Sequence, residues 1–213
     1  MKSQIYILVL FLSFIKLGNT QNKILFVGGD SLLVKNITLF DSTQEISFQL
    51  YNSGRTKFFN KDEIFSIIDN KTGKETILFE PFAEDSFNFT INNMRHFIHG
   101  EQYSDKHSEW FAGMLGLGIG FASPILMANK FNPFYSPLPV AIATAFIGST
   151  APSRNKIKRM YPKLANDPYF LEGYILNSKA RRINSSLRGG IIGFVAGWIT
   201  AIVLSNQPKP IKQ

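Results

Sequence analysis

The chain of 213 residues contains no cysteine. A disulfide framework, a thiolate zinc site, a catalytic thiol and a lipid-modified N-terminal cysteine are therefore all excluded. Charged residues are also few, at 18% against 45% hydrophobic residues, and this balance excludes a disordered, highly charged tail protein. The length suits one ordinary domain or two small ones and is too short for a large multi-domain enzyme.

The sequence also lacks the motifs by which many enzyme classes are recognised. Serine, histidine and aspartate occur without a nucleophile elbow, without a glycine-rich phosphate loop and without paired acids on one element. The residues therefore predict no catalytic site and no cofactor. A hydrolase is the least favoured of the functional hypotheses.

The N-terminus has the features of an export signal. A single positive charge precedes an apolar run from Ile5 to Ile15, and Gly18 and Thr20 occupy the −3 and −1 positions of a signal-peptidase site. We expect residues 1–20 to be a cleaved signal peptide. The alternative is an uncleaved anchor helix, although the run is short for a complete span. Both interpretations place the rest of the chain outside the cytoplasm.

Residues 21–82 are expected to form a small β domain. Apolar and polar residues alternate in short runs that are separated by turn sequences, a pattern typical of half-buried strands. The predicted strands cover residues 23–27, 32–40, 45–51, 56–59, 63–68 and 74–79. The fold class is accordingly α+β, with a small antiparallel β meander or SH3-like barrel followed by a helical membrane region.

Residues 83–109 are interpreted as a linker that becomes helical near the membrane. His96, His99 and His107 lie there among acidic residues, and a His-x-x-His pair on a helix can bind a metal because positions i and i+3 share a face. Gly100 argues against a continuous helix, and no fourth ligand is evident. Solvated linker histidines are therefore favoured over a metal site.

Three apolar segments occupy the second half of the chain. Residues 110–128 are uncharged and long enough to cross a bilayer. A shorter, proline-led apolar segment completes the region 110–151 and is more typical of a re-entrant or interfacial piece than of a full crossing. Residues 189–205 form the second predicted transmembrane helix, and 206–213 are the C-terminal tail.

Residues 152–188 form a basic segment between the two predicted transmembrane helices. Its nine basic residues face only Asp167 and Glu172, so this segment holds +7 of the formal net charge of +8. Such a segment is normally a topology signal retained in the cytoplasm, and a second interpretation is contact with anionic lipid head groups. The residues assigned to these two roles are Arg154, Lys156, Lys158, Arg159, Lys179, Arg181, Arg182 and Arg188.

Within the basic segment, Asp167 and Pro168 predict a helix start, with a side-chain cap and a proline at the first position. Apolar residues then recur at four-residue spacing, as Phe170 and Tyr174 do, so this helix could lie on the membrane surface. The basic residues occur without a recognisable RNA or DNA fold. Nucleic acid is therefore not an expected partner.

These segments predict a membrane topology. If the β domain is exported and the basic segment stays in the cytoplasm, an odd number of crossings must separate them. We expect residues 110–128 to cross, the proline-led segment to insert only partly, and residues 21–109 to lie on the exported side of the inner membrane.

Glycine spacing is the most specific feature of the apolar segments. Gly116 and Gly120 in the first helix, and Gly189, Gly193 and Gly197 in the second, recur every four residues. Lipid provides little hydrophobic drive between helices, so flat glycine faces act by letting backbones approach closely. The glycine faces predict either packing of the two helices within one chain, which is the simpler interpretation, or assembly of a homo-oligomer.

Short motifs in both halves resemble a group of bacterial envelope proteins of unknown function. In the β domain these motifs are Gly29-Asp30-Ser31-Leu32, Glu45-Ile46-Ser47-Phe48, Lys61-Asp62-Glu63-Ile64-Phe65 and Gly73-Lys74. In the second half they are Ser136-Pro137-Leu138-Pro139, Ala151-Pro152, Tyr161-Pro162, Tyr169, Gly173-Tyr174, Ala180 and the late glycines. The resemblance implies an export signal, a short β domain and a hydrophobic C-terminal half, and it supplies no catalytic residue.

Two functional hypotheses follow from this organisation. The first is a non-enzymatic integral membrane protein of the cell envelope, whose residues 21–82 bind another protein or the envelope matrix through an exposed sheet edge. The second is an oligomeric channel or transporter subunit built from glycine-faced helices. The apolar segments contain no acidic or basic residue, whereas ion paths usually need one.

Overall fold

The computed structural model describes residues 21–40, 44–81, 89–130, 135–150 and 152–205, without the side chains of 128–130 and 205. The expected signal peptide, 1–20, and the tail, 206–213, lie outside the described residues. The chain divides at Ile91 into two compact units, which we call the strand unit and the helical unit and describe separately.

The strand unit is a six-stranded antiparallel sheet within the described residues, with strand order β4-β3-β2-β1-β5-β6. Its strands are β1 (Asn22–Phe26), β2 (Ser31–Phe40), β3 (Glu45–Leu50), β4 (Thr56–Asn60), β5 (Ile64–Asp69) and β6 (Glu75–Ile77), with a short 3-10 turn η1 (Lys61–Glu63) before β5. This sheet, followed by helices, confirms the predicted α+β fold class. The predicted strands agree with the observed ones to within one or two residues at most ends.

The core of the strand unit lies on one face of the sheet. Ile24, Val34, Phe48 and Ile64 are fully buried there. Phe59 of β4 stacks on Phe48, with ring centroids 5.4 Å apart, and its ring also lies 5.0 Å from that of Phe26 in β1. Since β4 and β1 are not neighbours in the sheet, this contact requires the sheet to curl over its core, as a small barrel does.

Asp69 stabilises the turn between β5 and β6. Its carboxylate accepts hydrogen bonds of 2.9 Å from the Lys71 backbone N–H and from the Thr72 hydroxyl. Gly73 in the same turn has a φ of +69°, a conformation that glycine adopts without strain. The hydrogen bond from Lys71, followed by that from Thr72, lowers the pKa of Asp69 below its ordinary value of 3.8.

We expect a carbon-detected NMR pH titration of the full-length chain to place the pKa of Asp69 below 3.8. Because the folded pKa is lower than the unfolded one, the stabilisation is complete above the unfolded pKa and is lost as the pH falls through the folded pKa. Thr72→Val should move the pKa part of the way back. A wild-type carboxyl group that titrates at 3.8 or above contradicts this account.

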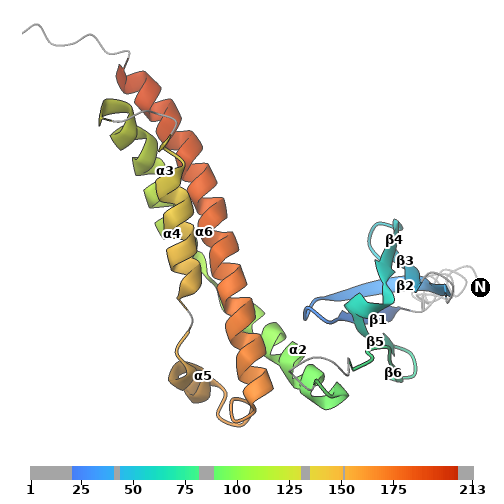
Figure 1. The fold of residues 1–213 in the computed structure, drawn as a ribbon. Coiled ribbons are helices and arrows are strands. Elements are labelled where there is room, and N and C mark those ends of the chain that lie inside the picture. The colour runs from blue at the N-terminus through green and yellow to red at the C-terminus, as the bar shows by residue number, and fades with distance from the viewer. Residues whose placement is uncertain (1–20, 41–43, 82–88, 131–134, 151, 206–213) are drawn as a thin grey trace, which may run out of the picture. The chain divides into compact units, whose positions relative to one another are not determined.

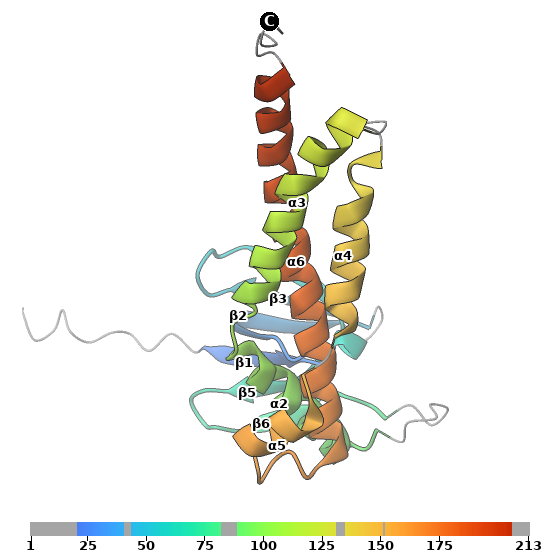
Figure 2. The same cartoon turned by 90° about the vertical axis from the view of Figure 1, so that its left-hand side faces the viewer.

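The helical unit contains α2 (Ile91–Asp105), α3 (Trp110–Lys130), α4 (Leu138–Ser149), α5 (Arg154–Met160) and α6 (Pro168–Ser205). Figures 1 and 2 show α3 and α6 side by side and running in the same direction, with α4 running back beside α6. Pro124 lies inside α3, and the hydroxyl of the preceding residue, Ser123, donates to the backbone carbonyl of Ser136, which links α3 to the segment just before α4.

Helix α2 occupies most of the segment that we interpreted as a linker, 83–109. The helix passes through Gly100, which we had taken as a helix-breaking residue. A Cβ at Gly100 would lie closer than 3.0 Å to the backbone of Phe170, and one at Gly173 would meet the backbone of Phe97 in the same way. Glycine is present here because α2 and α6 pack backbone to backbone, and this close packing offsets its low helix propensity.

Helix α6 is continuous across residue 189, where we had separated a surface helix from a transmembrane helix. The predicted start is confirmed, since the Asp167 carboxylate accepts hydrogen bonds from the backbone N–H groups of Tyr169 at 2.9 Å and Phe170 at 3.1 Å. At the roughly 1.5 Å rise per residue of an α-helix, its 38 residues exceed what a bilayer core requires. The helix is therefore too long for its polar first half and its apolar second half to fit together within a bilayer core.

Helices α2 and α3 contact α6 in one constant register. Hydrogen bonds join Asn177 to the carbonyl of Glu101 and Ser185 to the carbonyl of Glu109, each across 76 residues of sequence. The close glycine contacts have the same spacing: Gly173 with Phe97, Gly189 with Gly113, Gly193 with Leu117 and Gly197 with Phe121. Both sets of residue numbers rise together, so α3 and α6 are parallel.

The return of the chain along α3 bears on the topology predicted from charge. Arg182 of α6 donates both to Glu109, just before α3, and to the carbonyl of Thr150, just after α4. Thr150 therefore lies at the level of Glu109, because α4 has carried the chain back along α3. The expectation that the basic segment lies on the opposite side from residues 83–109 treated the segment before residue 152 as a partial insertion, whereas α4 returns the chain to the level of Glu109.

Helices α3 and α6 are long and apolar enough to cross a membrane. Their best windows, within Trp110–Met127 and Pro168–Leu204, have mean hydropathies of 1.6 and 1.8, and 28% of each window is buried. The core helix of a soluble protein would be mostly buried. Here apolar side chains face outward on all three helices of the bundle, including Phe111, Phe146 and Ile192 at 62%, 72% and 63% exposure.

Candidate functional site

The five glycines predicted to pack helices all lie at the contact between α3 and α6. A Cβ at Gly116 would approach the backbone of Ser186, and one at Gly120 the backbone of Gly190. From α6, Gly189, Gly193 and Gly197 meet the backbones of Gly113, Leu117 and Phe121. Each of these contacts would be closer than 3.0 Å, so the two backbones touch without intervening side chains.

Helix α4 packs on α6 through further glycines. Gly148 of α4 lies against the side chain of Ile183, and Gly190 of α6 lies against that of Val140. Gly118 differs from these residues because nothing lies within 4 Å of the position of a Cβ there. This open glycine is a natural control for substitutions at the packed ones.

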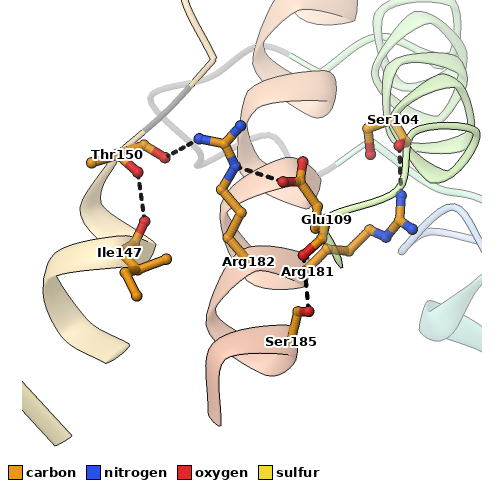
Figure 3. A network of polar contacts seen from close by, with 7 residues as sticks. All are labelled: Ser104, Glu109, Ile147, Thr150, Arg181, Arg182 and Ser185. Carbon is orange, nitrogen blue, oxygen red and sulfur yellow. Dashed lines mark hydrogen bonds and ion pairs between the residues drawn. The ribbon is translucent and has the colours of Figure 1, made fainter. Parts of the chain in front are cut away.

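A polar network lies at the level where α3 begins and α4 ends (Figure 3). The Arg182 Nε donates to the Glu109 carboxylate at 2.9 Å, and its Nη1 donates to the carbonyl of Thr150 at 3.1 Å. The two charged side chains retain only 23% and 17% exposure. Removing either the carboxylate or the guanidinium would destabilise the fold, because the remaining charge would be poorly solvated at this depth.

Arg181, the residue before Arg182, links α6 to α2. Its Nη1 donates to the carbonyl of Ser104 at 2.5 Å, and its Nε lies 3.6 Å from the carboxylate of Asp105. Asn177, one turn earlier, donates to the carbonyl of Glu101 and to the carboxylate of Asp105. Arg181 and Arg182, which we had assigned to topology or lipid head groups, therefore hold α6 to its neighbours.

The other basic residues of the predicted set are more open. Arg154, Lys156, Lys158 and Arg159 are exposed on α5, which is anchored by the fully buried Ile157. Ile157 joins Phe170 and Tyr174 in a cluster that is completed by Tyr103 and Tyr161, whose rings meet edge to face. On α6, Lys179 is half-buried and Arg188 is exposed.

The three histidines do not converge on a metal site among the residues that the structure describes. His96 lies 3.2 Å from the carboxylate of Asp167, and the Nε2 of His107 lies 3.0 Å from the hydroxyl of Tyr161. His99 is exposed on α2. His96 and His107 thus contribute to contacts of α2 and of the segment after it with the rest of the helical unit.

A cavity of about 580 Å³ opens beside the polar network. Apolar side chains of α3 and α4 line one part, and polar or charged side chains at the start of α5 and on α6 line the other. The sequence had not pointed to this cavity. The sequence features that could have indicated it are Glu109 and Thr150, which directly flank two apolar segments, and the basic pair in the later helix.

Comparisons with protein-family models, with curated proteins and with solved structures give no match. The functional argument therefore rests on the geometry of this chain.

The strand unit exposes apolar side chains near one edge of its sheet. Strand β4 pairs with β3 and is an edge strand of the described sheet. Its Phe58 is 63% exposed, and Leu39 and Phe40 of β2 are also exposed. In the sheet register Thr38, Ser47 and Phe58 are aligned across three strands, so Phe58 and Phe40 lie on the same outer face.

Proposed function

We propose that the protein is a non-enzymatic integral membrane protein of the bacterial cell envelope, in which the helical unit anchors the chain and the strand unit binds a partner protein. The observation that supports this proposal most is the outward-facing apolar surface of α3, α4 and α6, next to a layer of ion pairs. Apolar side chains in such numbers favour a lipid environment over water.

The parallel packing of α3 and α6 bears on sidedness. Helices α2 and α5 and the first half of α6 lie at the same end of the helical unit (Figures 1 and 2). This supports the proposal that residues 92–109 and the basic segment share one side of the membrane. We propose that this is the exported side, together with residues 21–82, since the N-terminal apolar run is an export signal. The basic residues then serve contacts with α2, α3 and lipid rather than retention in the cytoplasm.

Single cysteines in the cysteine-free chain test this arrangement directly. We expect Asn92→Cys and Ser153→Cys, both at exposed positions, to react with a membrane-impermeant maleimide from outside intact spheroplasts. Tyr135→Cys lies just before α4, at the opposite end of the bundle, and Tyr135 is 58% exposed. It should react only after permeabilisation. Labelling of Asn92→Cys and Ser153→Cys from opposite sides would contradict the parallel bundle, and labelling of both only from inside would contradict export.

The edge strand β4 is the proposed binding surface for an extended segment of a partner protein. An edge strand offers backbone N–H and C=O groups for one more strand, and an exposed aromatic residue such as Phe58 adds an apolar anchor. Lys57, which lies over the ring of Phe59 at 6.0 Å, is the kind of charged edge residue that limits indiscriminate pairing.

Photo-crosslinking in intact cells tests the binding proposal. A photoreactive phenylalanine analogue at position 58 of the full chain should give a reproducible crosslinked protein. The same analogue at Tyr51, which is 36% exposed in the turn after β3, is the matched control and should give much less. Equal crosslinking at both positions, or none at position 58, would argue against β4 as the binding edge.

The alternative, an oligomeric channel subunit, has less support. Its glycine faces at Gly116, Gly120, Gly189, Gly193 and Gly197 are filled by the contact between α3 and α6. Oligomerisation through the same faces would require these two helices to separate.

A further inference from the structure

The cavity beside the polar network has an apolar part and a polar part, as a lipid molecule has. Its apolar part is lined from α3 by Phe111, Leu115 and Ile119 and from α4 by Ala143, Phe146 and Ile147. Phe111 and Phe146 are strongly exposed, so this part opens onto the apolar surface of the bundle. An acyl chain could enter from the surrounding bilayer without crossing a polar layer.

The other part of the cavity is polar and cationic. Lys156 from α5 and Arg182 from α6 line it, together with the neutral groups Thr150, Tyr174 and Ser178. Glu109 and His107 also line this part, but Glu109 is neutralised by Arg182, and His107 contacts the Tyr161 hydroxyl. Lys156 has no ion-pair partner among the described residues, so the excess charge at this end is positive.

Arg182 keeps hydrogen-bonding capacity for a ligand. The bonds to Glu109 and Thr150 use Nε and Nη1, and Figure 3 shows Nη2 directed away from both. A guanidinium with an engaged carboxylate on one side is held rigidly, and its remaining N–H groups suit the oxygens of a phosphate.

The depth of the polar part matches the level of lipid head groups. It lies at the start of α3 and the end of α4, next to Trp110, which is 66% exposed. Exposed tryptophan at the end of an apolar helix is typical of the membrane interface. The volume of about 580 Å³ falls in the range of roughly 300–1,000 Å³ that is usual for ligand sites.

We propose that this cavity binds an anionic glycerophospholipid of the host membrane. The phosphate lies between Lys156 and Arg182, and one acyl chain follows the apolar groove between α3 and α4. Basic pockets between membrane helices recognise anionic lipid head groups by this combination of charge and adjoining apolar surface. The inference rests on the proposal that the helical unit is embedded in lipid.

Native mass spectrometry of the full chain from detergent tests the inference with two lipids of equal acyl composition, phosphatidylglycerol and phosphatidylcholine. We expect tighter binding of phosphatidylglycerol. Lys156→Gln should reduce that preference about fivefold, which corresponds to the roughly 1 kcal/mol expected for one basic residue near a lipid surface. Lys158→Gln, on the same helix but outside the cavity lining, is the matched control and should leave the preference unchanged.

A second variant tests the apolar part. Ala143→Leu extends a side chain into the groove and should weaken both lipids alike, with little change in their ratio. Equal binding of the two lipids by the wild type, or equal losses in Lys156→Gln and Lys158→Gln, would overturn the proposed site. Carbonate extraction separates this failure from failure of the membrane proposal. A chain that stays in the membrane pellet but shows no lipid preference contradicts only the lipid site.

Discussion

Gly193→Leu should destabilise the helical unit by about 3 kcal/mol, at the upper end of the cost of overpacking. A Cβ at this position would lie closer than 3.0 Å to the backbone of Leu117, and also 2.9 Å from the backbone nitrogen of Phe121. Backbone atoms cannot rotate away as a side chain can, so α3 and α6 must move apart and lose the contacts on either side. The free energy of unfolding, measured by SDS titration in mixed micelles, reports this loss.

Gly118→Leu is the matched control for this experiment. It makes the same substitution in an apolar helix of the same bundle, at a position where nothing lies within 4 Å of the new Cβ. We expect its unfolding free energy to stay within about 0.5 kcal/mol of the wild type, as for a surface substitution. Equal destabilisation by the two variants would mean that close packing of α3 on α6 is not what holds the bundle together.

Arg182→Ala is expected to cost about 3 kcal/mol, because it leaves the carboxylate of Glu109 without its partner in a largely buried position. The substitution also removes the hydrogen bond to the carbonyl of Thr150, which fastens the end of α4. The loss should therefore appear both in the unfolding free energy and as faster hydrogen exchange around Thr150. Arg188→Ala, at an exposed position of the same helix, should have little effect.

A charge reversal distinguishes pairing from general positive charge. Glu109→Arg alone places two guanidinium groups together and should be at least as damaging as Arg182→Ala. Combining Glu109→Arg with Arg182→Glu restores opposite charges and should recover part of the lost stability. No recovery in the double variant would indicate that the position of each group, rather than their attraction, determines stability.

Local patterns predicted the elements of the strand unit well. Alternation of apolar residues at Ile46, Phe48 and Leu50 is sufficient to predict β3, because successive side chains of a strand point to opposite faces, although Ser47 between them is buried as well. The curl that brings Phe59 to Phe26 was expected only as a general barrel shape, since this contact joins residues from strands that are not adjacent in the sheet.

Long-range pairing accounts for what the sequence did not predict. Gly100 has low helix propensity, and its place in α2 is explained only by the backbone of Phe170 opposite it. The direction of α6 was also missed, since counting basic residues treats all of them as free charges. Arg181 and Arg182 are instead engaged by Asp105 and Glu109, partners more than 70 residues away.

The constant separation of 76 residues between the positions of α3 and those of α6 that the late glycines contact has a consequence for biogenesis. During translation α3 is complete long before the opposing glycines of α6 have been synthesised. Its glycine face must therefore remain uncovered by α6 while the α3–α4 hairpin forms, so docking of α6 is the closing step of assembly. A nascent chain that ends before Gly189 lacks that step altogether and would be a substrate for membrane quality control.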